Sequence, residues 1–542
     1  MVIIFSLLLL VLPFQETREP YDLIIKNGVV YDGTGSNGIN ADVGVIGDRI
    51  VEIGDLSGNT AVKVLDAEGL AVAPGFINML SWAASPLMND GRSMSDIKQG
   101  VTLEVFGEGS SLGPAGGPDR EWTTLGEGLD YLVEQGVSTN VASFVGATTI
   151  RIYVLGSNDM APDTEQLRRM QELVREAMRE GALGVGTSLI YPPAFYADTD
   201  ELIALAEAAA EYDGMYISHM RSEGDKLLEA VDELVTISGE AGIDAEIYHL
   251  KAAGERNWHK LDMVLDRIDS LQNAGHHVTA NMYTYPAAST GLAATVPPWV
   301  REGSFSEFIE RIHDPEIRER VLTEMNSPET EWENFLQLAN DPDNILLLSF
   351  NAEELQPYIG KTLGEVAEER GTDPANTALD LLTINEGNIQ SVFFLMAEEN
   401  IRRQIQLPYM TFGSDARSVA AEGWVLQSST HPRTYGTFAR LLGKYVRDEK
   451  LISLEEAIHR LTGMPAERLK IENRGRLQPG YFADVVIFDP ETIEDRATYV
   501  EPHQYSVGVK HVFVNGVQVL DSGEHTGETP GRFVKGPGYE KR

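Results

Sequence analysis

Residues 163–189, DTEQLRRMQELVREAMREGALGVGTSL, join an amphipathic helical pattern directly to an apolar strand pattern. The apolar residues of the first part recur at steps of three and four, which predicts a helix with one buried face: Leu167, Met170, Val174 and Met178. Gly181 predicts the end of this helix. A second helix is expected between Asp198 and Gly214, and MYISH at 215–219 follows it as a strand. This alternation is typical of strands that pair in parallel.

Working outward from this unit, the same alternation extends over most of the chain. We count eight candidate strands, at residues 71–80, 101–108, 140–146, 182–189, 214–220, 244–250, 277–283 and 409–416. Eight such strands over several hundred residues favour an α/β fold, a closed (β/α)8 TIM barrel, which we place at residues 74–465. Residues 291–400 are too long for one connection and are predicted to hold an insertion with extra helices or a lid.

Both ends of the chain carry short strand patterns of a different kind. Residues 20–73 and 466–524 contain apolar runs separated by turn signals, among them Asn27-Gly28, Gly47-Asp48 and Asn515-Gly516. We therefore expect a small β-sandwich domain assembled from both ends. Residues 525–542 are predicted to be a polar tail.

Composition limits the classes of partner. The 542 residues include 43 Lys and Arg against 83 Asp and Glu, for a net charge of −40, which disfavours binding to nucleic acid or to an anionic membrane. Cysteine is absent, so a metal would have to be held by histidine, a carboxylate or a modified lysine. A small-molecule substrate fits this balance, and oligomeric state is left open.

The first residues form a short apolar run, MVIIFSLLLLVLP, that is too short to span a bilayer. Residues 1–19 are predicted to be a signal peptide, which implies a periplasmic or secreted protein. The run lacks a preceding basic residue and an Ala-x-Ala cleavage site. A mis-assigned start codon, with a cytoplasmic protein, and a weak anchor are the alternatives.

Chemically reactive residues close several of the predicted strands, where active sites of such barrels lie. The residues concerned are Glu104, Glu108, His219, Arg221, His249, Lys251, Tyr283 and Asp415. Two histidines and one carboxylate can bind a divalent metal and leave a position open for water. Asp415 would then serve as the general base, and Lys251 and Arg221 would attract an anionic group of the substrate.

Each of these residues also has an ordinary structural interpretation. Asp415 can be a helix cap, Glu108 a solvated loop residue, and Lys251 and Arg221 members of ion pairs. A single histidine at a strand end is more often structural than a ligand. Two histidines that close neighbouring strands, His219 and His249, favour the metal interpretation.

At these residues the chain resembles the D-aminoacylase branch of the amidohydrolase superfamily, along nearly its whole length after the apolar start. Two segments are shared with many amidohydrolases: LIIKNGVVYDGTG at 23–35 and APGFI at 73–77. More specific segments are QGVT at 99–102, EGALGV at 180–185, YISHMRSE at 216–223, HLKAAG at 249–254, YTYPAAST at 283–290, FGSD at 412–415, HPRTYG at 431–436 and PGYFAD at 479–484.

The resemblance implies a zinc hydrolase that removes the acyl group from N-acyl-D-amino acids. It implies His219 and His249 as metal ligands and Asp415 as the catalytic carboxylate. It assigns the substrate carboxylate to Lys251, Tyr283 and Ser289, and we add Arg221 and Arg433 as substrate-binding residues. Tyr191, within SLIYP at 188–192, is expected to polarise the scissile carbonyl.

The chain departs from this family at three metal motifs. The family has His-x-His after strand one, where this chain has NMLSW at 78–82, and Gly-Asn-Cys-Gly after strand two, where it has GEGS at 107–110. A further family histidine is replaced within residues 146–151. We therefore expect one ion, with Glu108 as its third ligand and Glu104 as the alternative.

Several alternatives stay open at this point. Zinc is the expected ion, although imidazole and carboxylate also accept Mn, Fe or Co. A dipeptidase or lactonase would use the same chemistry. A non-catalytic binding protein on a degenerate barrel is the third hypothesis, because fold alone does not establish function.

Overall fold

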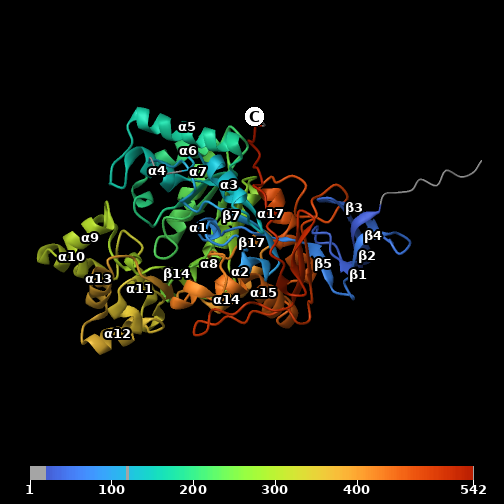
Figure 1. The fold of residues 1–542 in the computed structure, drawn as a ribbon. Coiled ribbons are helices and arrows are strands. Elements are labelled where there is room, and N and C mark those ends of the chain that lie inside the picture. The colour runs from blue at the N-terminus through green and yellow to red at the C-terminus, as the bar shows by residue number, and fades with distance from the viewer. Residues whose placement is uncertain (1–19, 118–120, 541–542) are drawn as a thin grey trace, which may run out of the picture.

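The computed structural model describes residues 20–117 and 121–540. Its centre is a barrel of parallel strands, the (β/α)8 fold expected from the sequence (Figure 1). The barrel strands are β6 (Phe76–Asn78), β7 (Val101–Phe106), β8 (Asn140–Ser143) continued by β9 (Val145–Gly146), β10 (Gly184–Ser188), β11 (Met215–His219), β12 (Asp244–Ile247), β13 (Val278–Met282) and β17 (Met410–Phe412).

Backbone hydrogen bonds close the barrel between its first and last strands. The Met79 N–H donates to the Phe412 carbonyl at 3.1 Å, and Ser81 forms a parallel bridge with Ala416. Because every strand runs in the same direction, the residues that follow β7, β11, β12 and β17 meet at one rim.

The two barrel helices whose bounds the sequence predicts are present, and the second ends at Ala210, before the predicted Gly214. The barrel helices include α3 (Leu125–Glu134), α4 (Ala147–Leu155), α5 (Thr164–Glu180), α6 (Thr199–Ala210), α7 (Leu227–Ala241), α8 (Lys260–Asn273) and α16 (Leu454–Leu461). Asp163 caps α5 by accepting from the Gln166 N–H, and Gly181 ends it with a positive φ of 109°. Met170, Val174 and Met178 are buried and Leu167 is half-buried, which confirms the predicted apolar face except at its first residue.

The segment between β13 and β17 forms a separate lobe with its own apolar core, at the lower left of Figure 1. It confirms the predicted extra helices and adds a small three-stranded sheet that the sequence did not suggest. Its elements are β14 (Ala288–Gly291), α9 (Phe305–Ile312), α10 (Pro315–Met325), α11 (Phe335–Ala339), β15 (Ile345–Leu347), α12 (Leu363–Arg370), α13 (Pro374–Asn385) and β16 (Gln390–Phe393). Tyr283 and Ile190 join this core, so the lobe packs directly beside the barrel rim.

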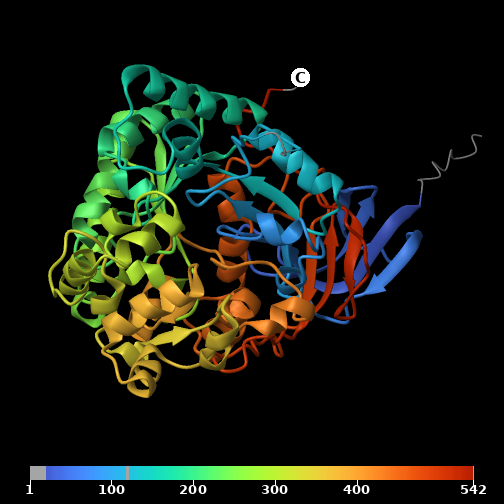
Figure 2. The ribbon, with the colours of Figure 1, turned by 60° about the vertical axis from the view of Figure 1, so that its left-hand side comes forward.

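The two ends of the chain form one β domain, as expected, and its strands are joined in one continuous sheet where the sequence predicted a sandwich. Figure 2 shows the first and last strands side by side. Nine strands are hydrogen-bonded into one sheet: β1 (Tyr21–Val30), β2 (Ile39–Ile46), β3 (Arg49–Gly54), β4 (Ala61–Asp66), β5 (Ala71–Pro74), β18 (Val485–Phe488), β19 (Val509–Val514), β20 (Val517–Asp521) and β21 (Glu524–His525). The central contact is the antiparallel pair of β5 and β18.

Two of the three predicted hairpin turns are confirmed, and one is wrong. Gly47-Asp48 joins β2 to β3, and Asn515-Gly516 joins β19 to β20. Asn27 and Gly28 instead lie inside β1, where the register against β2 shifts. Asn27 has a φ of 58°, and its side-chain amide donates to Asp66, so the pair forms a bulge rather than a chain reversal.

Residues 525–540 are not the free tail that their polarity suggests. The Val141 N–H donates to the Arg532 carbonyl, and the Val534 N–H donates back to the Val141 carbonyl. Val534 is buried in the apolar cluster inside the barrel. The segment therefore lies against β8 and completes the core.

The predicted first strand, at 71–80, is split into β5 and β6, because Gly75 turns the chain from the β domain into the barrel and its N–H donates to Asp484 O.

The predicted signal peptide lies outside the described residues. Within the described part of the chain, no helix combines the length and the apolar character needed to span a membrane.

Candidate metal centre

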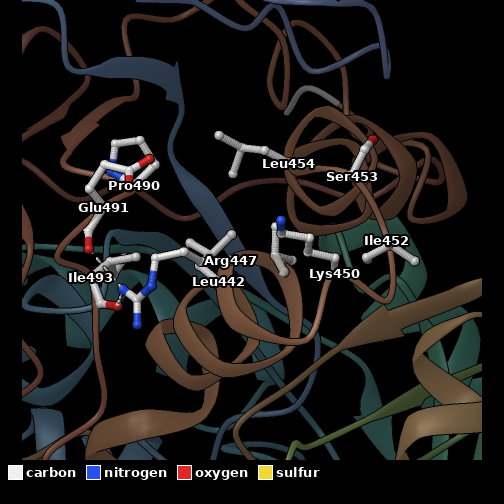
Figure 3. A pocket seen from close by; sticks show the side chains of 10 residues that line it. Leu442, Arg447, Lys450, Ile452, Ser453, Leu454, Pro490, Glu491 and Ile493 are labelled. Atoms are coloured by element: carbon white, nitrogen blue, oxygen red, sulfur yellow. Dashed lines mark hydrogen bonds between the residues drawn. The ribbon is translucent and has the colours of Figure 1, made fainter.

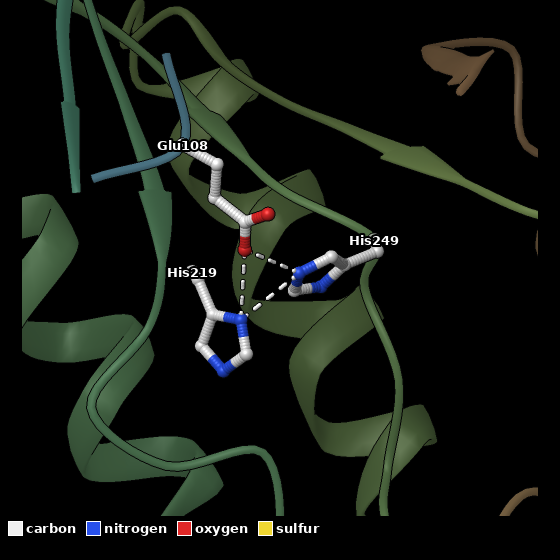
Figure 4. A group of neighbouring side chains, drawn as sticks. All are labelled: Glu108, His219 and His249. Atoms are coloured by element: carbon white, nitrogen blue, oxygen red, sulfur yellow. Dashed lines mark hydrogen bonds and ion pairs between the residues drawn. The ribbon is translucent and has the colours of Figure 1, made fainter. Parts of the chain in front are cut away.

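Glu108, His219 and His249 come together at the barrel rim from three different strand ends (Figure 4). The atoms that face one another are Glu108 Oε1, His219 Nδ1 and His249 Nε2, and all three pairwise distances are 3.0 Å. Each of the three residues is at most 4% exposed. This is the one group of three or more such side chains with mutually close ligand atoms among the described residues.

The donor set fits a divalent cation. Three atoms 3.0 Å apart can each lie about 2.0 Å from one common point, which is the usual bond length from zinc to nitrogen or oxygen. Hydrogen bonds satisfy the triangle less well, because each neutral imidazole carries a single N–H. A buried carboxylate flanked by two imidazoles is also a hard and borderline ligand set that suits zinc.

A second carboxylate, Glu223, supports the two histidines from behind. Glu223 Oε1 lies 3.0 Å from His249 Nδ1, and Oε2 lies 3.7 Å from His219 Nε2. Such a partner fixes the ring orientation and the tautomer of a metal-ligating histidine. Glu223 ends the segment YISHMRSE, but its residue type and position did not predict this role.

The charges of this group favour bound positive charge. Burial raises the pKa of Glu108, but His249 and His219 lower it more, to about 2. Burial and Lys251 lower the pKa of His249, but Glu223 and Glu108 raise it more, to about 9. The negative charge of Glu108 and Glu223 beside the two imidazoles therefore favours a bound cation.

Lys251 lies inside the same group. Its Nζ is 2.6 Å from Glu223 Oε1 and 2.7 Å from His249 Nδ1, and it sits 5.6 Å from the centre of the Tyr283 ring. Lys251 is therefore paired with Glu223 while it faces the predicted substrate residue Tyr283.

Glu104, the alternative third ligand, is not part of the metal group. Its carboxylate accepts hydrogen bonds from the hydroxyls of Ser81, Ser93 and Thr139 at 2.7–3.0 Å. Burial and the charge of Asp96 raise the pKa of Glu104 to about 8, so the group is mostly protonated at neutral pH. The structure brings Glu108, not Glu104, to the histidines.

Asp415 follows β17 at the same rim, where one of its oxygens accepts a hydrogen bond and the other lies in an ion pair. Trp82 Nε1–H donates to Oδ1 at 3.0 Å, and Arg433 Nη1 lies 2.7 Å from Oδ2. Asp415 has a φ of 49°, a left-handed conformation that the surrounding contacts must hold in place. The helix-cap interpretation does not apply, because Asp415 precedes no helix directly.

Three predicted site residues lie near these groups and differ in their contacts: Tyr191, Tyr283 and Ser289. The Tyr191 ring packs edge-on against His219 at 5.3 Å, and its hydroxyl contacts Thr290 Oγ1 at 2.9 Å. Tyr283 lies under the Arg433 guanidinium at 4.6 Å, and its buried hydroxyl has no partner among the described residues. Ser289 Oγ donates to the Ser391 carbonyl at 3.0 Å.

Arg221 is the predicted substrate-binding residue that the structure places elsewhere. Its guanidinium pairs with Glu233 of α7 at 2.9 Å and also donates to the carbonyls of Phe195 and Ala197. These contacts agree with the ion-pair interpretation of Arg221, and its substrate-binding role stays a prediction.

A separate surface cavity of about 450 Å3 lies between the π-helical segment η8 (Leu441–Asp448) and the residues after β18 (Figure 3). None of the predicted site residues lines it.

Comparison with known proteins places the chain in a family. Residues 410–520 match the pattern of the amidohydrolase family. A D-aminoacylase of Alcaligenes xylosoxydans xylosoxydans is 32% identical over 534 residues, which cover 96% of this chain and 99% of the relative. The chain belongs to the D-aminoacylase branch of the amidohydrolases.

Two solved structures of this branch superpose on the chain with a TM-score of 0.79, at 30% identity, over 95% of this chain and 100% of theirs. One is N-acyl-D-glutamate deacylase from Bordetella bronchiseptica, complexed with zinc and a phosphonate mimic of the tetrahedral intermediate. The other is a D-aminoacylase described by its binuclear metal centre, with one-metal activation and second-metal attenuation.

Proposed function

We propose that this D-aminoacylase relative is a zinc-dependent hydrolase that removes the acyl group from N-acyl-D-amino acids. The observation that carries the proposal is the 3.0 Å triangle of Glu108, His219 and His249 at the same rim as Asp415. It keeps a complete three-ligand site although the chain has no cysteine. The D-aminoacylase and N-acyl-D-glutamate deacylase relatives support the choice of bond and substrate.

In this mechanism Glu108, His219 and His249 hold the ion. When bound there, the ion polarises the scissile carbonyl and lowers the pKa of water. The Asp415 carboxylate accepts the proton of the attacking water and returns it to the leaving nitrogen as the C–N bond breaks. Tyr191 donates a hydrogen bond to the carbonyl oxygen; burial raises its pKa, so its hydroxyl keeps its proton.

Orientation of the substrate is assigned to Arg433, which pairs with Asp415, and to Tyr283, whose ring lies under Arg433. Arg433 is 4% exposed, and its Nε has no hydrogen-bond partner among the described residues. The Tyr283 hydroxyl is in the same situation. Buried donors without partners are costly, so a substrate carboxylate that accepts from Arg433 and Tyr283, with Lys251 nearby, would relieve that cost.

We expect a chelator to abolish hydrolysis of N-acetyl-D-amino acids and one equivalent of zinc to restore it. The reason is that, among the described residues, the structure offers this one three-ligand site for the ion. Metal content measured by mass spectrometry, alongside acetate release, checks this. Full activity of protein that holds less than about 0.1 zinc ion per chain would rule out the metal mechanism. Zinc binding without turnover of any N-acyl-D-amino acid, dipeptide or lactone would favour a binding protein.

The substrate side chain is proposed to be acidic, because of Arg301. This residue is partly exposed, its Nε is buried without a partner, and burial lowers its pKa to about 10. The groups that act on its charge are Tyr196 and Tyr191, and no carboxylate is among them. Tyr191 packs on His219, so the charge of Arg301 interacts electrostatically with a ring that contacts a metal ligand.

We expect Arg301→Met to lower kcat/KM for N-acetyl-D-glutamate by about 10- to 100-fold, the cost of a lost charged hydrogen bond. Turnover of N-acetyl-D-leucine should change less than about threefold. Arg169→Met, an exposed arginine on α5, is the matched control. Equal losses on both substrates would show that Arg301 acts on structure and not on side-chain selection.

A further inference from the structure

The carboxylate of Asp415 is held by two residues that are not metal ligands. Trp82 donates its indole N–H to Oδ1, and Arg433 lies against Oδ2. Two backbone hydrogen bonds flank this contact: Trp82 N–H to Ala416 O, and Asp415 N–H to Leu80 O, both at 2.9 Å. The segment after β6 is therefore fixed against the segment after β17, and the indole has little freedom to leave the carboxylate.

Trp82 contacts this carboxylate from the segment that follows β6. Its side chain is 41% exposed, an unusual exposure for an indole on a strand end that otherwise leads into the barrel core. Its neighbours along the chain, Met79 and Leu80, are buried and apolar. Within the described residues, the only cluster of close metal-ligating side chains is the one formed by Glu108 and the two histidines.

We propose that Trp82 is the positioning residue of the general base: its indole N–H orients the Asp415 carboxylate beside a site that holds a single ion. This rests on the proposed function, because it assumes that Asp415 moves the proton. An N–H donor orients one carboxylate oxygen and leaves that oxygen a further lone pair for water. The enzyme then works with a single ion, and excess metal does not attenuate it.

The test compares Trp82→Phe with Trp424→Phe. The first variant removes the N–H and keeps an aromatic ring, and the second changes an indole that is 55% exposed in η7 (Gly423–Gln427). We expect Trp82→Phe to lower kcat by about 10- to 100-fold with KM within threefold and an unchanged melting temperature. Trp424→Phe should match the unmodified protein. An unchanged kcat in Trp82→Phe would overturn the positioning role.

A second measurement does not depend on turnover. Titration of the metal-free protein with zinc, followed by calorimetry and mass spectrometry, should saturate at one ion per chain, and two ions per chain would overturn the proposal. Crystal structures should show the Asp415 carboxylate in one orientation in the unmodified protein and rotated in Trp82→Phe. If the protein binds one ion and holds Asp415 in one orientation but hydrolyses no substrate, the proposed function is refuted. The positioning contact between Trp82 and Asp415 would still be supported.

Discussion

Asp415→Asn should lower kcat for N-acetyl-D-amino acids by about 100- to 10,000-fold, the usual contribution of a general acid–base group. An amide has nearly the same shape as the carboxylate, so the Trp82 N–H can still donate to its oxygen. It cannot accept the proton of water and return it to the leaving nitrogen. Steady-state kinetics at saturating substrate measure the loss directly.

The loss must appear in kcat, with zinc content unchanged, because Asp415 is not among the three close ligand atoms. Retention of more than about a tenth of kcat would remove Asp415 from the proton-transfer role. A fall in bound zinc would instead show that Asp415 helps to hold the ion. Removing the carboxylate also leaves the buried Arg433 without its anion, so the melting temperature is measured in parallel.

Glu108→Gln should weaken zinc binding by more than about 100-fold and abolish activity at low zinc concentration. Loss of a residue that only supports a ligand already costs about 10- to 100-fold, and Glu108 supplies a ligand atom and the negative charge of the group. The amide keeps an oxygen but loses the charge that balances a dication. Competition with a chromogenic chelator gives the affinity.

Glu104→Gln is the matched control, because it makes the same chemical change on the same segment of chain. The pKa of Glu104 is raised to about 8, so the native group is already neutral at pH 7 and an amide resembles it. Zinc affinity should stay within about threefold. Equal losses of zinc affinity in both variants would show that Glu104 and Glu108 affect the metal site together. The choice of Glu108 as the third ligand would then be open again.

The sequence predicted the barrel well because its signals are local. The helix over α5 needs only an apolar period and a cap at Asp163, and the strands β10 and β11 are apolar runs between turn residues. The segment around Asn27-Gly28 was misjudged, because a positive φ occurs in a bulge as well as in a turn. The C-terminal segment was misjudged because its packing depends on a distant partner, Val141.

In the site, residue type predicted the role well where that type has few other roles at such a position. His219 and His249 have few other uses at the ends of neighbouring buried strands, and they meet as expected. Arg221 and Glu104 were harder, because charged groups pair with whatever lies nearest, here Glu233 and three hydroxyls. Trp82 and Glu223 were not predicted, because their roles come from contacts across the barrel rather than from their residue types.

The β domain has a consequence for synthesis of the protein. Strand β5 ends at Pro74 and its partner β18 begins at Val485, so the ribosome must make the whole barrel between them. At about 5 to 20 residues per second, the first strands wait roughly 20 to 80 s with an open edge. Edges of this kind pair readily with other chains, so production in cells should depend on chaperones that shield the nascent N-terminal segment.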